Sequence, residues 1–171
     1  MDNHSSQYEV VIVGGSYAGL SAALALGRSL RKVLIIDDGK PCNRQTPHSH
    51  NFLTWDGATP AEIGQAAREQ VEKYPTVSWL HERVADIDGA DGNFKVITQS
   101  GQEFSSKKII FTTGVRDIIP PIPGMAESWG SAWCIAPTAT VTSSATSLRA
   151  CSQMVPSPYS SAAWSATSPT N

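Results

Sequence analysis

The sequence predicts an α/β fold in which a parallel sheet is joined to an antiparallel β-meander. Two observations carry this prediction. Two short runs rich in β-branched residues, Glu9–Val13 and Val33–Ile36, flank a segment rich in alanine and leucine, as in a strand–helix–strand unit. Further on, between residues 77 and 112, apolar runs alternate with glycine-containing turns at short spacing, which is typical of antiparallel strands.

The first predicted unit joins two strands through one helix. Glu9–Val13 (EVVIV) is typical of a strand buried on both faces, and Gly14-Gly15 forms the turn after it. We predict a helix over Ser16–Leu30, with an apolar stripe at Leu20, Ala23, Leu24 and Gly27. Val33–Ile36 (VLII) is the second buried strand and ends at Asp37. A crossover of this kind is normally right-handed, with parallel strands.

A long polar loop follows, from Lys40 to Gly57, and loops of this length in a compact domain usually carry function. Thr59-Pro60-Ala61-Glu62 then predicts the start of a helix, because threonine suits the cap, proline the first position and glutamate the third. We expect this helix to run to about Tyr74, since Pro75 follows it.

The predicted meander consists of Val77–Ile87, Phe94–Thr98 and Glu103–Ser105, separated by turn residues. Lys108–Thr112 (KIIFT) is predicted as a further apolar strand. Ile119–Gly124 (IPPIPG) predicts a stiff, extended connector.

Charge divides the chain near residue 130. Of the 28 Asp, Glu, Lys and Arg residues, 27 lie in positions 1–130, and the last 41 residues contain only Arg149. We therefore expect a folded N-terminal part over residues 1–118, a connector over 119–130 and a low-complexity, disordered tail over 131–171. The net charge of −2 and the lack of any basic run argue against nucleic-acid binding as the main role.

An uncharged run from Val10 to Gly27 could be taken for a membrane span or a signal peptide. No Lys or Arg precedes the run, and Gly14-Gly15-Ser16 breaks it after a strand-like segment. We therefore predict a strand, a turn and a helix here and no membrane association. The cysteines at 42, 134 and 151 have neither metal-ligand spacing nor a disulphide-framework pattern, which favours a reducing, cytoplasmic location.

Gly14-Gly15-Ser16-Tyr17-Ala18-Gly19 is nearly the G-x-G-x-x-G turn of dinucleotide-binding domains, with Ser16 at the second glycine. The glycines of that motif allow a tight turn, close approach to a pyrophosphate and close helix–strand packing. Asp37 stands 23 residues after Gly14, at the end of the next strand, where a carboxylate accepts hydrogen bonds from a ribose. The alternative is a glycine-rich turn in an unrelated α/β domain. The motif itself does not distinguish FAD from NAD.

Residues 8–130 resemble the thioredoxin reductase-like branch of the FAD-dependent pyridine nucleotide–disulphide oxidoreductases. The resemblance rests on segments that occur in the family's order: YEVVIVGGSYAGLSAALALGR, VLIIDDGKPCNR, HSHNFLTWDG, KKIIFTTGVRD and IIPPIPGMAESWG. It implies a Rossmann-like FAD-binding domain, of which this chain holds an incomplete N-terminal part, followed in the intact family by an NADPH-binding domain. It also implies a homodimer and a disulphide substrate or thioredoxin-like partner.

The resemblance further implies which residues hold FAD: Gly14, Gly15, Ser16, Ala18, Gly19, Asp37, Asn43, Arg44, Val84, Thr113 and Gly114. The glycine turn would hold the pyrophosphate, and Asp37 would bind the adenosine ribose. Asn43 and Arg44 would line the flavin side, and Val84 would approach the adenine through its backbone. The last two residues would close a second FAD motif, in which Thr112 stands in place of the usual alanine.

Three further residues have two interpretations each. Cys42 could be a redox cysteine, but it has no partner thiol nearby and stands where the family commonly has arginine, which favours an ordinary loop residue. His48 and His50 could be a metal pair or a base, but no cysteine or carboxylate cluster completes a site. Contact with FAD or solvent is favoured, and we predict no catalytic residue and no metal ligand in this chain.

The tail suggests a shifted reading frame. If each new codon starts at the last base of the old one, residues 134–144 (CIAPTATVTSS) allow His-Cys-Pro-Tyr-Cys-His-Gly-Tyr-Glu-Phe. This block carries the redox Cys-x-x-Cys pair that the resemblance implies after the connector. We therefore hypothesise that residues from about 131 onward are translated out of frame; the alternative is a natural disordered tail.

In the intact family, NADPH reduces FAD, and the flavin reduces the Cys-x-x-Cys disulphide that then exchanges with a partner. This chain has cysteines at 42, 134 and 151 and no such pair. We expect weak or no stable FAD binding and no disulphide reductase turnover. The alternatives are a non-catalytic FAD- or ADP-binding fragment and a non-functional product.

Overall fold

The computed structural model describes residues 6–128, and its first unit ends at Pro120. Eight elements make up this unit in chain order: β1 (Ser6–Val13), α1 (Tyr17–Arg28), β2 (Val33–Asp37), α2 (Pro60–Val71), β3 (Val77–His81), β4 (Val84–Ala90), β5 (Asn93–Thr98) and β6 (Glu103–Phe111). Of the second unit, residues 121–128 are described, and they contain the short helix α3 (Met125–Ser128). The fold confirms the predicted α/β class.

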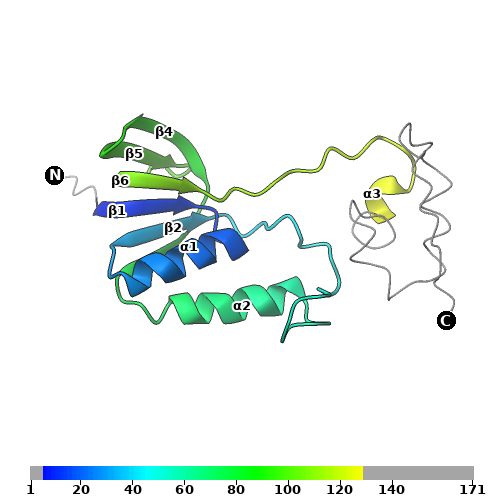
Figure 1. Ribbon diagram of the computed structural model, residues 1–171. Helices are drawn as coiled ribbons and strands as arrows, with labels where there is room; N and C mark the ends of the chain where they lie inside the picture. The colour runs from blue at the N-terminus through cyan, green and yellow to red at the C-terminus, as the bar shows by residue number, and fades with distance from the viewer. Residues whose placement is uncertain (1–5, 129–171) are drawn as a thin grey trace, which may run out of the picture. The chain divides into compact units, whose positions relative to one another are not determined.

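The strands form one six-stranded sheet in the order β3-β2-β1-β6-β5-β4 (Figure 1). β3, β2, β1 and β6 run parallel, whereas β6, β5 and β4 form an antiparallel meander. β1 lies at the centre, where Val11 pairs with Leu34 on one side and with Ile109 on the other. The predicted βαβ unit is therefore confirmed, with the meander attached to the same sheet.

Strand β6 belongs to both parts of the sheet. Its first half, Glu103–Ser106, pairs antiparallel with β5, while residues 104–111 pair parallel with β1. The prediction of two separate strands, Glu103–Ser105 and Lys108–Thr112, was wrong in this respect. The polar residues between them do not interrupt the strand, because β1 continues to pair with it throughout.

The single predicted strand Val77–Ile87 was also wrong, since the structure divides it into two strands with different partners. β3 pairs parallel with β2 at the outer edge of the sheet, and β4 pairs antiparallel with β5. The chain turns between them at Glu82, whose N–H donates to the Asp37 carbonyl at 3.0 Å. The Glu82 carboxylate accepts the Ser100 N–H at 2.6 Å, and hydrogen bonding to Ser100 lowers the pKa of Glu82.

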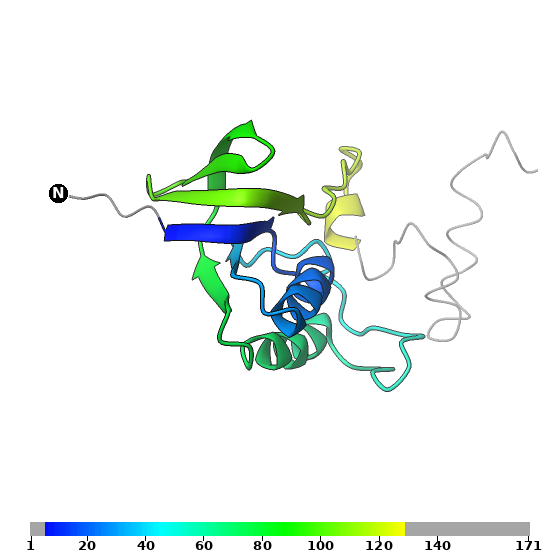
Figure 2. The same cartoon turned by 60° about the vertical axis from the view of Figure 1, so that its left-hand side comes forward.

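Alternating side chains of the central strands supply two apolar clusters, one on each face of the sheet. The first contains Val10, Ile12, Val33 and Ile35 and packs against α1 and α2 (Figures 1 and 2). The second contains residues of β1 and β2 together with Val96 of the meander, which is fully buried. The predicted burial of β1 and β2 on both faces is confirmed.

The two long helices begin in different ways. α2 has the predicted capping box: the Thr59 hydroxyl accepts the Glu62 N–H at 3.2 Å, and the Glu62 carboxylate accepts the Thr59 N–H at 2.8 Å. Hydrogen bonds donated to its carboxylate lower the pKa of Glu62: the Thr59 N–H contributes most, and the Thr59 hydroxyl also donates, at 2.9 Å. At α1, by contrast, the N-cap Ser16 makes no side-chain capping bond, and the first turn carries no acidic residue.

Replacing Glu62 by glutamine should make the stability of the domain less sensitive to acid. A carboxyl whose pKa is lowered by folding stabilises the fold above its ordinary pKa of 4.5, and this contribution disappears as the pH falls through the lowered value. The wild-type chain should therefore lose more stability than the variant between about pH 7 and about pH 3. Thermal melts at both pH values measure this, with Glu69→Gln on the same helix as control. Equal acid sensitivity of wild type and E62Q would contradict it.

Two predictions lie outside the described residues. These are the disordered, low-complexity nature of 131–171 and its out-of-frame origin; sequencing the gene across the codons for 125–155 tests the second. Within residues 6–128, none of the helices is both long enough and apolar enough to cross a membrane.

Candidate functional site

The carboxyl ends of the parallel strands meet at one edge of the sheet, which is where ligands bind in open α/β sheets. β1 leads there into Gly14, β2 ends at Asp37, β3 ends at His81, and β6 leads into Thr112. Hydrogen bonds tie these ends together: the Gly14 N–H donates to the Ile36 carbonyl, and the Thr112 N–H donates to the Val13 carbonyl, each at 2.8 Å. The motif residues predicted from the sequence therefore lie along one edge.

Three glycines of the turn lie where a side chain would not fit. A Cβ on Gly14, which has a φ of +102°, would clash with the Thr112 backbone, its carbonyl carbon lying 2.8 Å away. A Cβ on Gly15 would lie 2.8 Å from Trp79 Cζ2 and 3.0 Å from Asp37 Cβ. A Cβ on Gly19 would clash with the Gly14 carbonyl oxygen. The turn thus brings helix α1 directly against the end of β1 and allows Trp79 and Asp37 to pack closely on Gly15.

This geometry fits the pyrophosphate of a dinucleotide. The amino end of α1 presents backbone N–H groups and a partial positive charge, and neither a capping side chain nor an acidic residue of the first turn neutralises it. α2 shows the contrast, because Thr59 and Glu62 already occupy its first N–H groups. Of the two long helices, α2 therefore has its first N–H groups capped by its own side chains, whereas the start of α1 is open to an external anion.

Asp37 lies beside this turn, at the end of β2, and is half-buried. Its carboxylate accepts the Gly39 N–H at 3.0 Å, which orients one oxygen. Gly39 has a φ of +71° and lies against His81, since an added Cβ would be 2.7 Å from His81 Cε1. The carboxylate is thus held in place at the turn, and its second oxygen could accept hydrogen bonds from a ribose.

Trp79 packs beneath the turn. It packs against the apolar cluster on the helix side, and its ring edge contacts Gly15. The Arg68 guanidinium of α2 stacks on the ring, 4.3 Å from its centroid. The indole N–H is buried and makes no hydrogen bond in the structure. The sequence did not indicate that this tryptophan would be the floor of the turn.

The remaining predicted site residues are Ser16, Ala18, Asn43, Arg44, Val84, Thr113 and Gly114. Ser16 and Ala18 begin α1, and Thr113 and Gly114 directly follow Thr112; all four lie by sequence at the same edge. Val84 is the first residue of β4 and packs against the meander-side cluster. Asn43 and Arg44 lie in the loop after β2, and Arg44 is exposed, with its guanidinium bonded to the Pro41 carbonyl at 3.1 Å.

Sequence reasoning assigned no contact to Thr112. Its hydroxyl oxygen lies 2.6 Å from the Gly14 carbonyl oxygen and 3.0 Å from that of Val13. The only signal in the sequence was the departure from alanine at this position.

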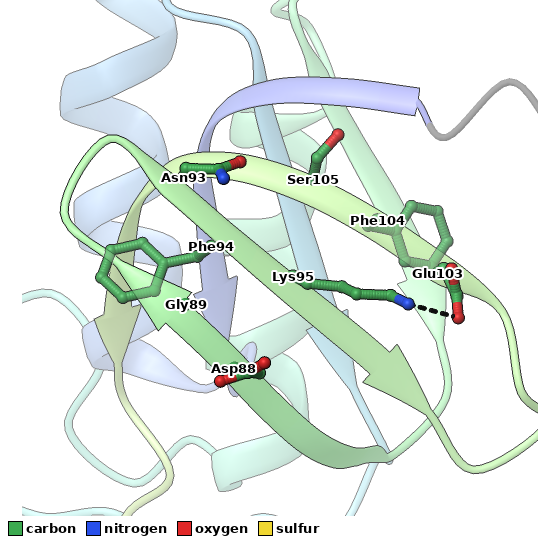
Figure 3. Close-up of a pocket in the computed structure, with 8 residues that line it drawn as sticks. All are labelled: Asp88, Gly89, Asn93, Phe94, Lys95, Glu103, Phe104 and Ser105. Atoms are coloured by element: carbon green, nitrogen blue, oxygen red, sulfur yellow. Dashed lines mark ion pairs between the residues drawn. The ribbon is translucent and has the colours of Figure 1, made fainter.

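The structure also has a cavity of about 340 Å³, far along the chain from the glycine turn, on the meander (Figure 3). Asp88, Gly89, Asn93, Phe94, Lys95, Glu103, Phe104 and Ser105 line it. Lys95 and Glu103 form an ion pair at 2.7 Å across neighbouring strands. None of the predicted site residues lines this cavity, so it is separate from the candidate site.

Comparisons with known proteins identify the family. Residues 8–146 match the family described as pyridine nucleotide-disulphide oxidoreductase. The chain is 35% identical to a probable thioredoxin reductase of Arthroderma benhamiae, over 75% of this chain and 34% of the relative. It is 36% identical to thioredoxin reductase sirT of Leptosphaeria maculans, over 73% of this chain and 39% of the relative. The chain thus spans 34–39% of the length of these relatives.

Solved structures show the same similarity. An oxidoreductase from Agrobacterium tumefaciens is 46% identical with a TM-score of 0.72, covering 73% of this chain and 42% of that chain. A putative thioredoxin reductase, TrxB, from Bacillus anthracis is 30% identical with a TM-score of 0.69, covering 72% and 42%.

Proposed function

Since this chain belongs to the pyridine nucleotide–disulphide oxidoreductase family, on its thioredoxin reductase-like branch, we propose that it forms the part of an FAD-dependent oxidoreductase that binds the ADP portion of FAD. The observation that carries the proposal is the glycine turn. Side chains at Gly14, Gly15 or Gly19 would clash with Thr112, Trp79 or the Gly14 carbonyl, so these glycines permit the tight turn that presents the uncapped start of α1 to a pyrophosphate.

The residues of this chain would act by binding and orientation. The open amino end of α1 would hold the pyrophosphate, and Asp37, fixed by the Gly39 N–H, would accept hydrogen bonds from the adenosine ribose. Val84, Thr113 and Gly114 would add backbone contacts, and Asn43 and Arg44 would border the flavin side. The bound flavin would supply the redox chemistry, and the protein would position it.

The activity of the whole protein is part of the proposal. It would transfer electrons from NADPH through FAD to a disulphide, acting on a thioredoxin-like partner as a cytoplasmic homodimer. For this chain by itself we propose weak FAD binding. We also propose no reductase turnover, because its three cysteines form no Cys-x-x-Cys pair. A purified chain that is yellow and reduces a disulphide with NADPH would overturn that part.

Calorimetric titration of the full chain with ADP, FAD, NAD and FMN tests the proposal. The three ADP-containing ligands should bind with similar affinity, whereas FMN, which lacks ADP, should not bind. Binding of FMN as tight as that of FAD would show that the glycine turn is not the recognition element. Circular dichroism with a melting curve separates a folded, non-binding chain from an unfolded product.

Replacing Asp37 by asparagine should weaken ADP binding about fivefold to tenfold, because a neutral amide oxygen is a weaker acceptor of the ribose hydroxyls than a carboxylate. The amide oxygen can still accept the Gly39 N–H, so the fold should be retained. Asp88→Asn, at an exposed position on β4, is the matched control and should leave the Kd unchanged. Equal Kd values of D37N and D88N for ADP would show that Asp37 does not bind the ribose.

A further inference from the structure

We propose that Thr112 is a positioning residue for the dinucleotide turn, whose hydroxyl fixes the direction of the Gly14 carbonyl and thereby the orientation of the Gly14–Gly15 peptide that leads into α1. This inference rests on the proposed function. It concerns a hydroxyl at the end of β6, 98 residues away in sequence from the turn it contacts.

The hydrogen bonds around Thr112 define the direction of its hydroxyl. Its backbone N–H donates to the Val13 carbonyl at 2.8 Å, so that acceptor is already engaged. The hydroxyl oxygen lies 3.0 Å from the same carbonyl but only 2.6 Å from the Gly14 carbonyl oxygen. The Gly14 carbonyl is therefore the favoured acceptor of the hydroxyl proton.

Gly14 needs such a constraint. Its φ of +102° lies in a region that glycine enters freely, so its own sterics hold the peptide only weakly. The Gly14 N–H is bonded to the Ile36 carbonyl of β2, which fixes one side of the residue. Thr112 fixes the other side, and the bare Cα of Gly19 packs against the same carbonyl oxygen. Gly14 is thus tied to both neighbouring strands and to α1.

Fixing this carbonyl also fixes the next N–H. In a planar trans peptide the C=O of one residue and the N–H of the next point in opposite directions. With the Gly14 oxygen held toward Thr112 and Gly19, the Gly15 N–H points away from β6 and α1. Gly15 itself is buried against Trp79 and Asp37. The orientation of this peptide therefore sets the path of the backbone into the uncapped start of α1, whose N–H groups would meet the phosphates.

The test compares Thr112→Val, which keeps the shape but removes the hydroxyl, with Thr112→Ser, which restores the hydroxyl. Thr98→Val is the matched control, because Thr98 is a buried threonine of the meander whose hydroxyl is also hydrogen-bonded. T112V should raise the Kd for ADP about threefold to tenfold, T112S should restore most of the affinity, and T98V should leave the Kd unchanged. The nitrogen–proton residual dipolar coupling of the Gly15 amide should change in T112V alone.

The two readouts separate the possible failures. If the wild-type chain binds ADP but T112V binds it equally well, the positioning role is wrong and the proposed function stands. If the wild-type chain does not bind ADP, the proposed function fails, and the Gly15 coupling, which needs no ligand, still decides whether Thr112 orients the turn. An unchanged coupling in T112V would overturn the inference.

Discussion

Replacing Gly19 by alanine should abolish binding of ADP-containing ligands and lower the free energy of unfolding by about 2 kcal/mol. The added methyl group would clash with the Gly14 carbonyl oxygen, which is backbone and also the acceptor of the Thr112 hydroxyl. The clash can be relieved only by moving α1 away from the end of β1, and this movement opens the turn. Urea denaturation and calorimetry with ADP measure the two effects.

Gly64→Ala provides the matched control, since it makes the same chemical change inside a helix. Gly64 lies in α2, and an added Cβ would meet no atom within 4 Å. Alanine stabilises a helix interior relative to glycine, so G64A should raise the free energy of unfolding by about 0.5–1 kcal/mol and leave ADP binding unchanged. If G19A and G64A both raise the free energy of unfolding, the described close approach of α1 to the Gly14 carbonyl is wrong.

Replacing Ile12 by alanine should lower the free energy of unfolding by about 2–5 kcal/mol, because a buried side chain is truncated and leaves a cavity. Ile12 is fully buried in the central strand and belongs to the cluster that joins the sheet to α1 and α2. A loss of this size is comparable to the whole stability of many domains. The expected result is a large decrease in the urea midpoint, or a chain that no longer melts cooperatively.

Leu53→Ala is the comparison for Ile12, since the side chain of Leu53 is 88% exposed. Its loss should change the free energy of unfolding by less than about 0.5 kcal/mol. Similar effects of I12A and L53A would show that the β1 core is not formed as described.

The βαβ unit could be predicted from the sequence because its signals are local. The apolar runs of β1 and β2, the glycine turn and the Thr59–Glu62 capping box each depend on residues a few positions apart. The position of Asp37 beside the turn followed from the parallel arrangement, because strands that run in the same direction end at the same edge.

The errors occurred where pairing partners are distant in the sequence. An apolar run such as Val77–His81 fits a parallel edge strand as well as a meander strand, and only its pairing with β2 decides between them. The same holds for β6, whose polar residues Ser105–Lys108 suggest a break. Cross-strand pairing with β1 overrides that local preference.

The contacts of Trp79 with Gly15 and of Thr112 with Gly14 could not be predicted from the sequence either. Trp79 reaches Gly15 because β3 lies at the edge of the sheet and α2 covers its ring with Arg68. Thr112 reaches Gly14 because β6 pairs with β1 in one particular register. Neither contact has a signature in spacing, since each depends on how the whole sheet assembles.

The separation of 98 positions between Gly14 and Thr112 also affects how the protein is made. A ribosome releases the glycine turn and α1 early, but β6, which flanks β1 and leads into Thr112, emerges only after nearly all of the unit that ends at Pro120 has been synthesised. Contacts between such distant segments form late, because a long loop must close before they are made. On a nascent chain, competence to bind nucleotide should therefore begin only when Thr112 has left the exit tunnel, so a free nucleotide cannot assist the earlier folding steps.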